Sequence, residues 1–125
     1  RSTRLPRAIR DVYKRQRYAR EADVQVLVKG GHLSGERASN ALVAPDGTTH
    51  VAEVARVATK NTHGTGCSLS SALATRMALG SATAAVTWAS EWLHEAIANA
   101  DELHVGQGHG PVHHFHRLYR LAGGV

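Results

Sequence analysis

The chain has 125 residues, of which 42% are hydrophobic and 20% are charged, a balance that allows one folded domain or part of a larger one. The hydrophobic share is too high for an intrinsically disordered chain. No apolar run approaches the ~20 residues of a membrane span. The single cysteine, Cys67, excludes a disulfide framework and makes a reducing cytoplasm the expected location. The chain begins with Arg1 and not with methionine, and we therefore expect a fragment.

The net charge of +5 originates in the first part of the chain. Residues 1–20 hold eight of the 15 Lys/Arg and one of the 10 acidic residues, so this segment carries +7 and the rest of the chain carries −2. Residues 1–16 show no clear helical or alternating apolar period. Their last six letters, DVYKRQ, back-translate to GAT GTG TAT AAG AGA CAG, which resembles the end of a transposase-type sequencing adapter.

We therefore expect residues 1–16 to be a non-native basic leader from adapter read-through, with native sequence over residues 17–125. Two alternatives stay open. One is a solvated, disordered leader, and the other is a true basic arm for nucleic acid or anionic lipid.

The next part of the chain predicts strands. Residues 24–28 (VQVLV) form a short β-branched apolar run that is typical of a buried parallel strand, followed by a flexible glycine turn at 29–31. Pro45-Asp46-Gly47 is a strong turn signal between apolar segments, which predicts a hairpin. The other elements expected here are a loop at 32–40, a strand at 41–44 and a strand at 48–57.

A polar, glycine-containing loop at 59–66 (TKNTHGTG) leads directly into a predicted helix at 67–79. Apolar residues on this helix recur every four positions and form one face, at Leu69, Leu73 and Met77. Gly80 suits the C′ position that ends such a helix.

A second helix is expected from a cap at Ser81 or Thr83 through Ala100. Its apolar stripe consists of Val86, Ala89, Leu93 and Ile97. A glycine turn at 106–110 and a short helix at 112–121 follow. A strand, hairpin, glycine loop and helix pair predict the C-terminal part of an α/β domain with an incomplete sheet, whose missing strands lie upstream.

The strongest motif is THGTGC at 62–67, at the junction of a loop and a helix. Glycine lets the backbone approach a ligand closely, and the first N–H groups of the helix have no internal partners, so phosphate or an oxyanion fits there. A thiol at the same helix start is expected to have a lowered pKa, which makes Cys67 a candidate base or nucleophile. No Lys-Ser/Thr of a Walker A loop and no GxGxxG spacing is present. The alternative is a glycine-rich helix entry with a buried, inert cysteine.

Three blocks carry a family resemblance: VKGGH at 28–32, NTHGTGCSLS at 61–70 and GQGHGPV at 106–112. They resemble the hydroxymethylpyrimidine/phosphomethylpyrimidine kinase of thiamine biosynthesis, a member of the ribokinase-like superfamily. THGTGC is specific, because most of the superfamily has aspartate where this kinase has cysteine. The resemblance covers roughly the C-terminal half of the family's chain and implies part of a ribokinase-like three-layer fold.

The resemblance implies transfer of the ATP γ-phosphoryl group to the pyrimidine's hydroxymethyl oxygen and then to its monophosphate. Cys67 would be the base, and the backbone N–H groups of Gly64, Thr65, Gly66 and Cys67 would form the anion hole. The expected cofactors are ATP and Mg²⁺, without a protein metal site. The expected cofactor-binding residues are Lys29, Gly30, Gly31, Thr62 and His63.

The family recognises the pyrimidine mainly with residues of its N-terminal half, so we expect the 125-residue chain itself to be inactive. The expected partner is a small-molecule pyrimidine, and neither nucleic acid nor a membrane is expected. A homo-oligomer of the full-length parent stays open. A pyridoxal-type vitamin kinase of the same superfamily is the close alternative. A non-catalytic basic-tailed module that binds nucleic acid is the alternative of another class.

Two further groups of residues invite a functional interpretation. The C-terminal histidines suggest a metal site, but no zinc spacing is present, and a partly exposed loop and helix is the expected alternative. Trp88 and Trp92 lie four residues apart, which predicts packing and not stacking on a base. The histidines in question are His109, His113, His114 and His116.

Overall fold

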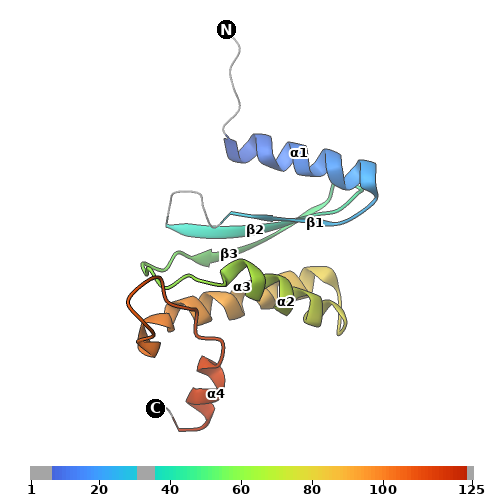
Figure 1. Cartoon of the computed structure of the whole chain (residues 1–125). Coiled ribbons are helices and arrows are strands. Elements are labelled where there is room, and N and C mark those ends of the chain that lie inside the picture. The colour runs from blue at the N-terminus through green and yellow to red at the C-terminus, as the bar shows by residue number, and fades with distance from the viewer. Residues whose placement is uncertain (1–6, 31–35, 124–125) are drawn as a thin grey trace. The chain divides into compact units, whose positions relative to one another are not determined.

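A computed structural model describes residues 7–30 and 36–123, with side chains from residue 13 onward. The chain forms two compact units, residues 1–53 and residues 54–125, and each has its own internal packing. Figure 1 labels the elements of both. No helix in the described part of the chain is long and apolar enough to cross a membrane.

The first unit begins with helix α1, Arg7–Ala22. The alternative of a disordered leader is therefore wrong for residues 7–16, which are helical although their sequence shows no clear helical period, because Arg, Ala, Lys and Gln are good helix formers. Ala19 is fully buried, and α1 packs against strands β1 and β2 of its own unit. Arg17 donates to Glu21 one turn later at 2.8 Å. The origin of residues 1–16 is a separate question and stays a prediction.

Three strands follow in the spatial order β1-β2-β3: β1 (Val26–Lys29), β2 (Arg37–Val43) and β3 (Thr49–Ala55). β1 runs antiparallel to β2, with Val26 opposite Val43. The expected buried parallel strand is therefore half-buried, and its described partner runs the other way. Along the opposite edge of β1, no strand pairs within the described residues.

The hairpin between β2 and β3 is confirmed. The Ala44 N–H donates to the Thr48 carbonyl at 2.9 Å, and Gly47 has a φ of 89° that favours glycine. Asp46 accepts from both the N–H and the hydroxyl of Thr48, which fixes the turn. β2 begins at Arg37, so the expectation of a loop through residue 40 is wrong there. The polar side chains of that segment do not prevent backbone pairing.

In the second unit, α2 (Thr65–Met77) and α3 (Ala82–Ala98) pack side by side (Figure 1). The Ser81 cap is confirmed, since its hydroxyl accepts from the Ala84 N–H at 3.2 Å. A short 3₁₀ helix η1 (Ala100–Leu103) and the helix α4 (His116–Leu121) complete the unit. The apolar residues that α2, α3 and the following segment bury are Leu69, Ala85, Val86, Ala89, Leu93, Ala96, Ala100 and Val112.

Three details of this unit differ from expectation. Met77 is exposed, so the apolar face of α2 ends before it. The C-cap of α2 is Ala78, and Gly80 therefore lies beyond the C′ position. α4 starts at His116 and not at residue 112, because Val112 and His113 donate their backbone N–H groups to His63 and Ala96 instead of entering a helix.

Candidate functional site

The glycine loop, expected over residues 59–66, ends at residue 64, because α2 begins at Thr65 and takes in the last two residues of the expected loop. Gly64 has φ 85° and ψ 9° and is the N-cap of α2, with no side chain serving as a cap. The Ser68 N–H donates to the Gly64 carbonyl at 2.9 Å and closes the first turn. Thr65 donates within the loop to the Thr62 carbonyl at 3.4 Å. The N–H groups of Gly66 and Cys67 lie in the first turn, where a helix offers no acceptor, and the positive end of the helix dipole lies behind them.

Cys67 is exposed and free. The alternative of a buried cysteine is therefore wrong for this chain. The side chain belongs to the third residue of α2, so it lies beside the N–H groups of the first turn. The sulfur is therefore accessible to a ligand that approaches the first turn of α2.

A second segment of the chain, residues 109–114, supports the glycine loop through its backbone. His63 donates its N–H to the Gly110 carbonyl at 3.1 Å, and Val112 donates to the His63 carbonyl at 3.4 Å. His63 and Pro111 thereby form an isolated parallel bridge. At the other end of the loop, the His109 Nδ1 lies 3.0 Å from the Lys60 carbonyl.

Asn61 connects this segment to the start of η1. Its Oδ1 accepts from the Gly110 N–H at 2.9 Å, and its Nδ2 donates to Asp101 at 2.7 Å. Thr59 also donates its hydroxyl to Asp101. The hydrogen bonds from Thr59 and Asn61 hold the pKa of Asp101 below its ordinary value. The loop is therefore fixed before it reaches the glycines.

The sequence alone does not predict these contacts, although NTHGTGC and GHGPV each belong to a block that resembles the family.

The C-terminal histidines make separate contacts. The buried His116 contacts Glu95 at 2.8 Å, and His114 Nε2 lies 2.7 Å from the Ser68 hydroxyl. No group of three metal-ligating side chains occurs among residues 13–30 and 36–123. Trp88 and Trp92 stack on each other with centroids 6.1 Å apart, as the packing interpretation predicts.

The remaining expected site residues belong to the other unit. Lys29 ends β1, and Gly30 donates to the Ser39 carbonyl at 2.7 Å. A Cβ at Gly30 would lie 2.3 Å from that carbonyl oxygen, so the close approach of the two strands requires glycine. Gly31 lies outside the described residues. The structure thus places Thr62 through Cys67 together where the loop meets α2, and it places Lys29 and Gly30 in a separate unit.

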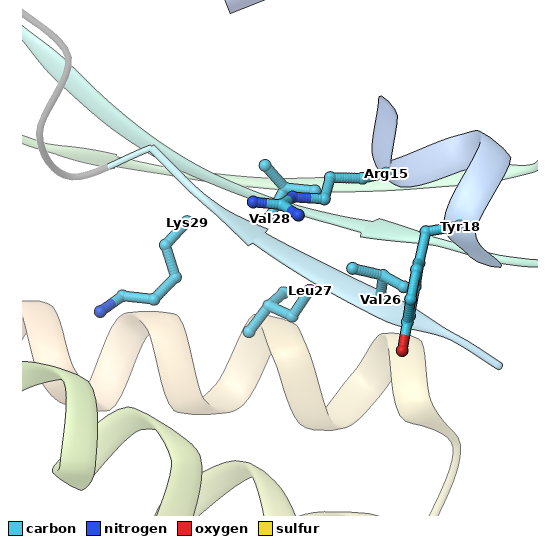
Figure 2. A pocket seen from close by; sticks show the side chains of 6 residues that line it. All are labelled: Arg15, Tyr18, Val26, Leu27, Val28 and Lys29. Carbon is cyan, nitrogen blue, oxygen red and sulfur yellow. The ribbon is translucent and has the colours of Figure 1, made fainter. Parts of the chain in front are cut away.

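Lys29 lines a hollow of about 410 Å³ along β1. Figure 2 shows Leu27 and Lys29 on one side of the strand, and Val28 with Arg15 on the other, as alternation along a strand requires. Arg15 lies within the expected leader, so this wall of the hollow depends on the origin of residues 1–16. The lining residues are Arg15, Tyr18, Val26, Leu27, Val28 and Lys29.

A model of the phosphomethylpyrimidine kinase family matches residues 7–113. The chain belongs to this family. It is 54% identical over 111 residues to the thiamine biosynthesis multifunctional protein ThiED of Corynebacterium efficiens, which covers 86% of this chain and 15% of that protein. It is 52% identical over 97 residues to the hydroxymethylpyrimidine/phosphomethylpyrimidine kinase of Rhizobium meliloti, which covers 76% of this chain and 36% of that protein.

Among solved structures, an ADP complex of Bacillus subtilis pyridoxal kinase is similar, with a TM-score of 0.69 and 25% identity. The likeness covers 90% of this chain and 42% of that one. It confirms the expected ribokinase-like α/β fold, of which this chain of the phosphomethylpyrimidine kinase family holds a part. The chain therefore spans less than half of the length of each of these relatives.

Proposed function

We propose that the protein containing this chain transfers the ATP γ-phosphoryl group to the hydroxymethyl oxygen of 4-amino-5-hydroxymethyl-2-methylpyrimidine and then to its monophosphate. The observation that carries the proposal is the start of α2, where left-handed Gly64 leads into unpaired N–H groups beside the exposed Cys67 thiol. Membership of the phosphomethylpyrimidine kinase family and relatives named as this kinase support the same reaction.

The chemistry of phosphoryl transfer suits this geometry. Its transition state spreads negative charge over the transferring oxygens, so catalysis is mostly positioning and charge stabilisation. In the proposal, the N–H groups of Gly64, Gly66 and Cys67 stabilise that charge, and the N–H of Thr65 joins them by giving up its long 3.4 Å bond to the Thr62 carbonyl. Cys67 accepts the proton of the attacking hydroxyl. Thr62 and His63 line the same loop and contact the phosphates.

Lys29, with Gly30 and Gly31, completes the nucleotide site in the proposal. The support for this role is the match of VKGGH at 28–32 to the family, because β1 pairs antiparallel with β2 and the rule for the carboxyl ends of parallel strands does not apply to that pair. Mg²⁺ is included as the counter-ion of the ATP phosphates, since Mg²⁺ is commonly bound through substrate phosphates and keeps several waters. A cytoplasmic location belongs to the proposal as well.

The test is turnover by the full-length gene product with ATP and each of three acceptors: the hydroxymethylpyrimidine, its monophosphate and pyridoxal. We expect phosphorylation of both pyrimidines at rates well above that of pyridoxal. Turnover of pyridoxal alone would favour the second candidate, a pyridoxal-type vitamin kinase, which the structural likeness to pyridoxal kinase supports. The 125-residue chain alone is expected to give no turnover, because it spans 36% of the Rhizobium meliloti kinase.

The leader is tested on the source DNA, sequenced across the codon for Arg17. A reading frame that continues upstream into a strand-rich half-domain is the expected result and gives the parent gene. If the DNA encodes RSTRLPRAIRDVYKRQ at this place, the leader is native. A nucleic-acid-binding arm then predicts salt-dependent binding that is lost on deletion of residues 1–16.

A further inference from the structure

A hydrogen bond between His114 and Ser68 joins residues that lie 46 positions apart in the chain. His114 Nε2 and Ser68 Oγ are 2.7 Å apart. The imidazole also faces Trp92 of α3, with ring centroids 6.0 Å apart and the rings tilted by 45°. Trp92 therefore limits the orientations of the His114 ring, and the ring nitrogen is held toward the serine.

Ser68 is the residue that directly follows Cys67. It is only 9% exposed, although it lies in the first turn of a helix. Its N–H donates to the carbonyl of Gly64 at 2.9 Å, while its hydroxyl shares the bond with His114. Ser68 is thus fixed at both its backbone and its side chain, and a displacement of Ser68 would carry the preceding Gly66 and Cys67 with it.

We propose that His114 is a positioning residue for phosphoryl transfer, acting through Ser68 to hold the first turn of α2. The inference rests on the proposed function, because it concerns the same anion hole. His114 itself touches no reacting atom in the proposal. Its task differs from that of the His63–Pro111 bridge, which fixes the loop before the glycines.

The expected kinetic effect follows from what the bond positions. N–H donors that stabilise a transition state must lie where the charge develops, and small displacements weaken them more in the transition state than in the bound ground state. A typical net hydrogen bond corresponds to roughly a threefold to tenfold change in an equilibrium or a rate. Loss of the bond should therefore lower kcat and leave the KM for ATP almost unchanged.

The experiment uses the full-length gene product and four variants. His114→Ala and Ser68→Ala each remove the bond, and His114→Gln keeps a nitrogen near the Nε2 position. Ser71→Ala is the matched control, since it deletes a hydroxyl on the same helix that bonds only within the helix, to the Cys67 carbonyl at 2.8 Å. kcat, the KM for ATP and Tm are measured for each.

We expect His114→Ala and Ser68→Ala to lower kcat by ~3- to 10-fold, with the KM for ATP within about twofold of the unmodified protein. His114→Gln should recover most of kcat, and the double variant of His114→Ala with Ser68→Ala should be no slower than the slower single variant. Ser71→Ala should stay within about twofold in kcat.

Contrary results separate the two proposals. If the unmodified protein transfers no phosphoryl group, the proposed function is wrong and this inference is wrong with it. If the unmodified protein is active and His114→Ala retains its kcat, this inference alone is overturned. Equal losses of kcat and Tm in His114→Ala and His114→Gln would show a purely structural role and overturn it as well. Where His114→Ala does not fold, Ser68→Ala against Ser71→Ala decides.

Discussion

In the proposed function, the glycine loop before α2 and the carboxyl end of β1 both bind phosphate, and the chain supports these two regions very differently. The loop is held by Asn61, by the His63–Pro111 bridge and by the His114–Ser68 bond, all within residues 54–125. Lys29 ends a four-residue strand that pairs with β2 along one edge only, among the described residues.

The difference shows that the two halves of the proposed site depend on different lengths of chain. The anion hole is specified by local and medium-range bonds that this chain contains. For Lys29, we propose that further strands of the parent complete the surroundings of β1. Substitutions at the loop should therefore have sharp, local effects, and substitutions around β1 should depend on the rest of the parent.

The largest effect is expected from Cys67→Ser in the full-length protein. Serine keeps roughly the size of the side chain, but its hydroxyl stays protonated near neutral pH and cannot take the proton, so kcat should fall by ~10²- to 10⁴-fold, the usual contribution of a general base. ATP binding should change little, because the N–H groups of the loop are retained. Turnover and ATP binding by calorimetry are measured on the same preparation. An equal loss of turnover and of ATP binding would show that the thiol has a structural role. The glycine loop would then differ from the β1 region in its support only, and not in catalysis.

Lys29→Ala tests the other region and should act mainly on ATP use. Removal of a cation beside phosphates is expected to raise the KM for ATP by ~10-fold, about 1.4 kcal/mol of binding. Arg37→Ala is the control in the same unit, since Arg37 is an exposed cation outside the hollow, and it should leave the KM for ATP within about twofold. Steady-state kinetics at varied ATP measure both. Unchanged kinetics in Lys29→Ala would show that Lys29 takes no part in ATP binding, and the glycine loop alone would then remain as the proposed phosphate site.

Gly110→Ala and Gly108→Ala test the segment that holds the glycine loop in place. A Cβ on Gly110 would lie 2.6 Å from Asn61 Oδ1, whereas a Cβ on Gly108 meets nothing within 4 Å. Gly110→Ala should therefore displace Asn61 and lower the free energy of unfolding by ~1–3 kcal/mol, with a fall in kcat. Gly108→Ala should be within about 0.5 kcal/mol of the unmodified protein. Urea unfolding measures the free energy of unfolding of both variants. Equal values for the two would show that the close contact between Gly110 and Asn61 does not hold Asn61 in place.

Several local features of the chain could be predicted from the sequence. The turn at Asp46-Gly47, the Ser81 cap and the start of a helix beside THGTGC all depend on bonds within a few positions, and short-range chemistry specifies them. The bond between His114 and Ser68 could not be found in this way, because nothing in the spacing of two polar residues 46 positions apart identifies them as partners.

The strands were predicted less well, for a physical reason. An apolar run such as VQVLV is compatible with a parallel or an antiparallel neighbour, since direction depends on the connection and not on the strand itself. The segment Arg37–Asn40 is polar and still pairs, because the ladder uses backbone groups. Helix α1 was missed because its basic residues form helix without the apolar period on which the prediction relied.

The smallest effect concerns an ion pair that ties α3 to α4 in the second unit. Glu95 accepts from Arg117 at 2.6 Å and contacts the buried His116 at 2.8 Å. The hydrogen bond from Arg117, with a further one from His116, lowers the pKa of Glu95 to about 2 from an ordinary 4.5. A carboxylate with a lowered folded-state pKa stabilises the fold above its unfolded pKa, and this contribution is lost as the pH falls from about 4.5 toward 2.

Glu95→Gln should therefore lower the free energy of unfolding at pH 7 by about 1 kcal/mol, because solvent reaches the side chain and screens the pair. The difference from the unmodified protein should shrink between pH 4.5 and pH 2.5, as measured by urea unfolding at each pH. Glu53→Gln, which removes an exposed 3.4 Å pair with Arg37 in the first unit, is the matched control and should change stability by less than about 0.5 kcal/mol. A pH-independent loss in Glu95→Gln would mean that its packing, and not its charge, holds α4 in place.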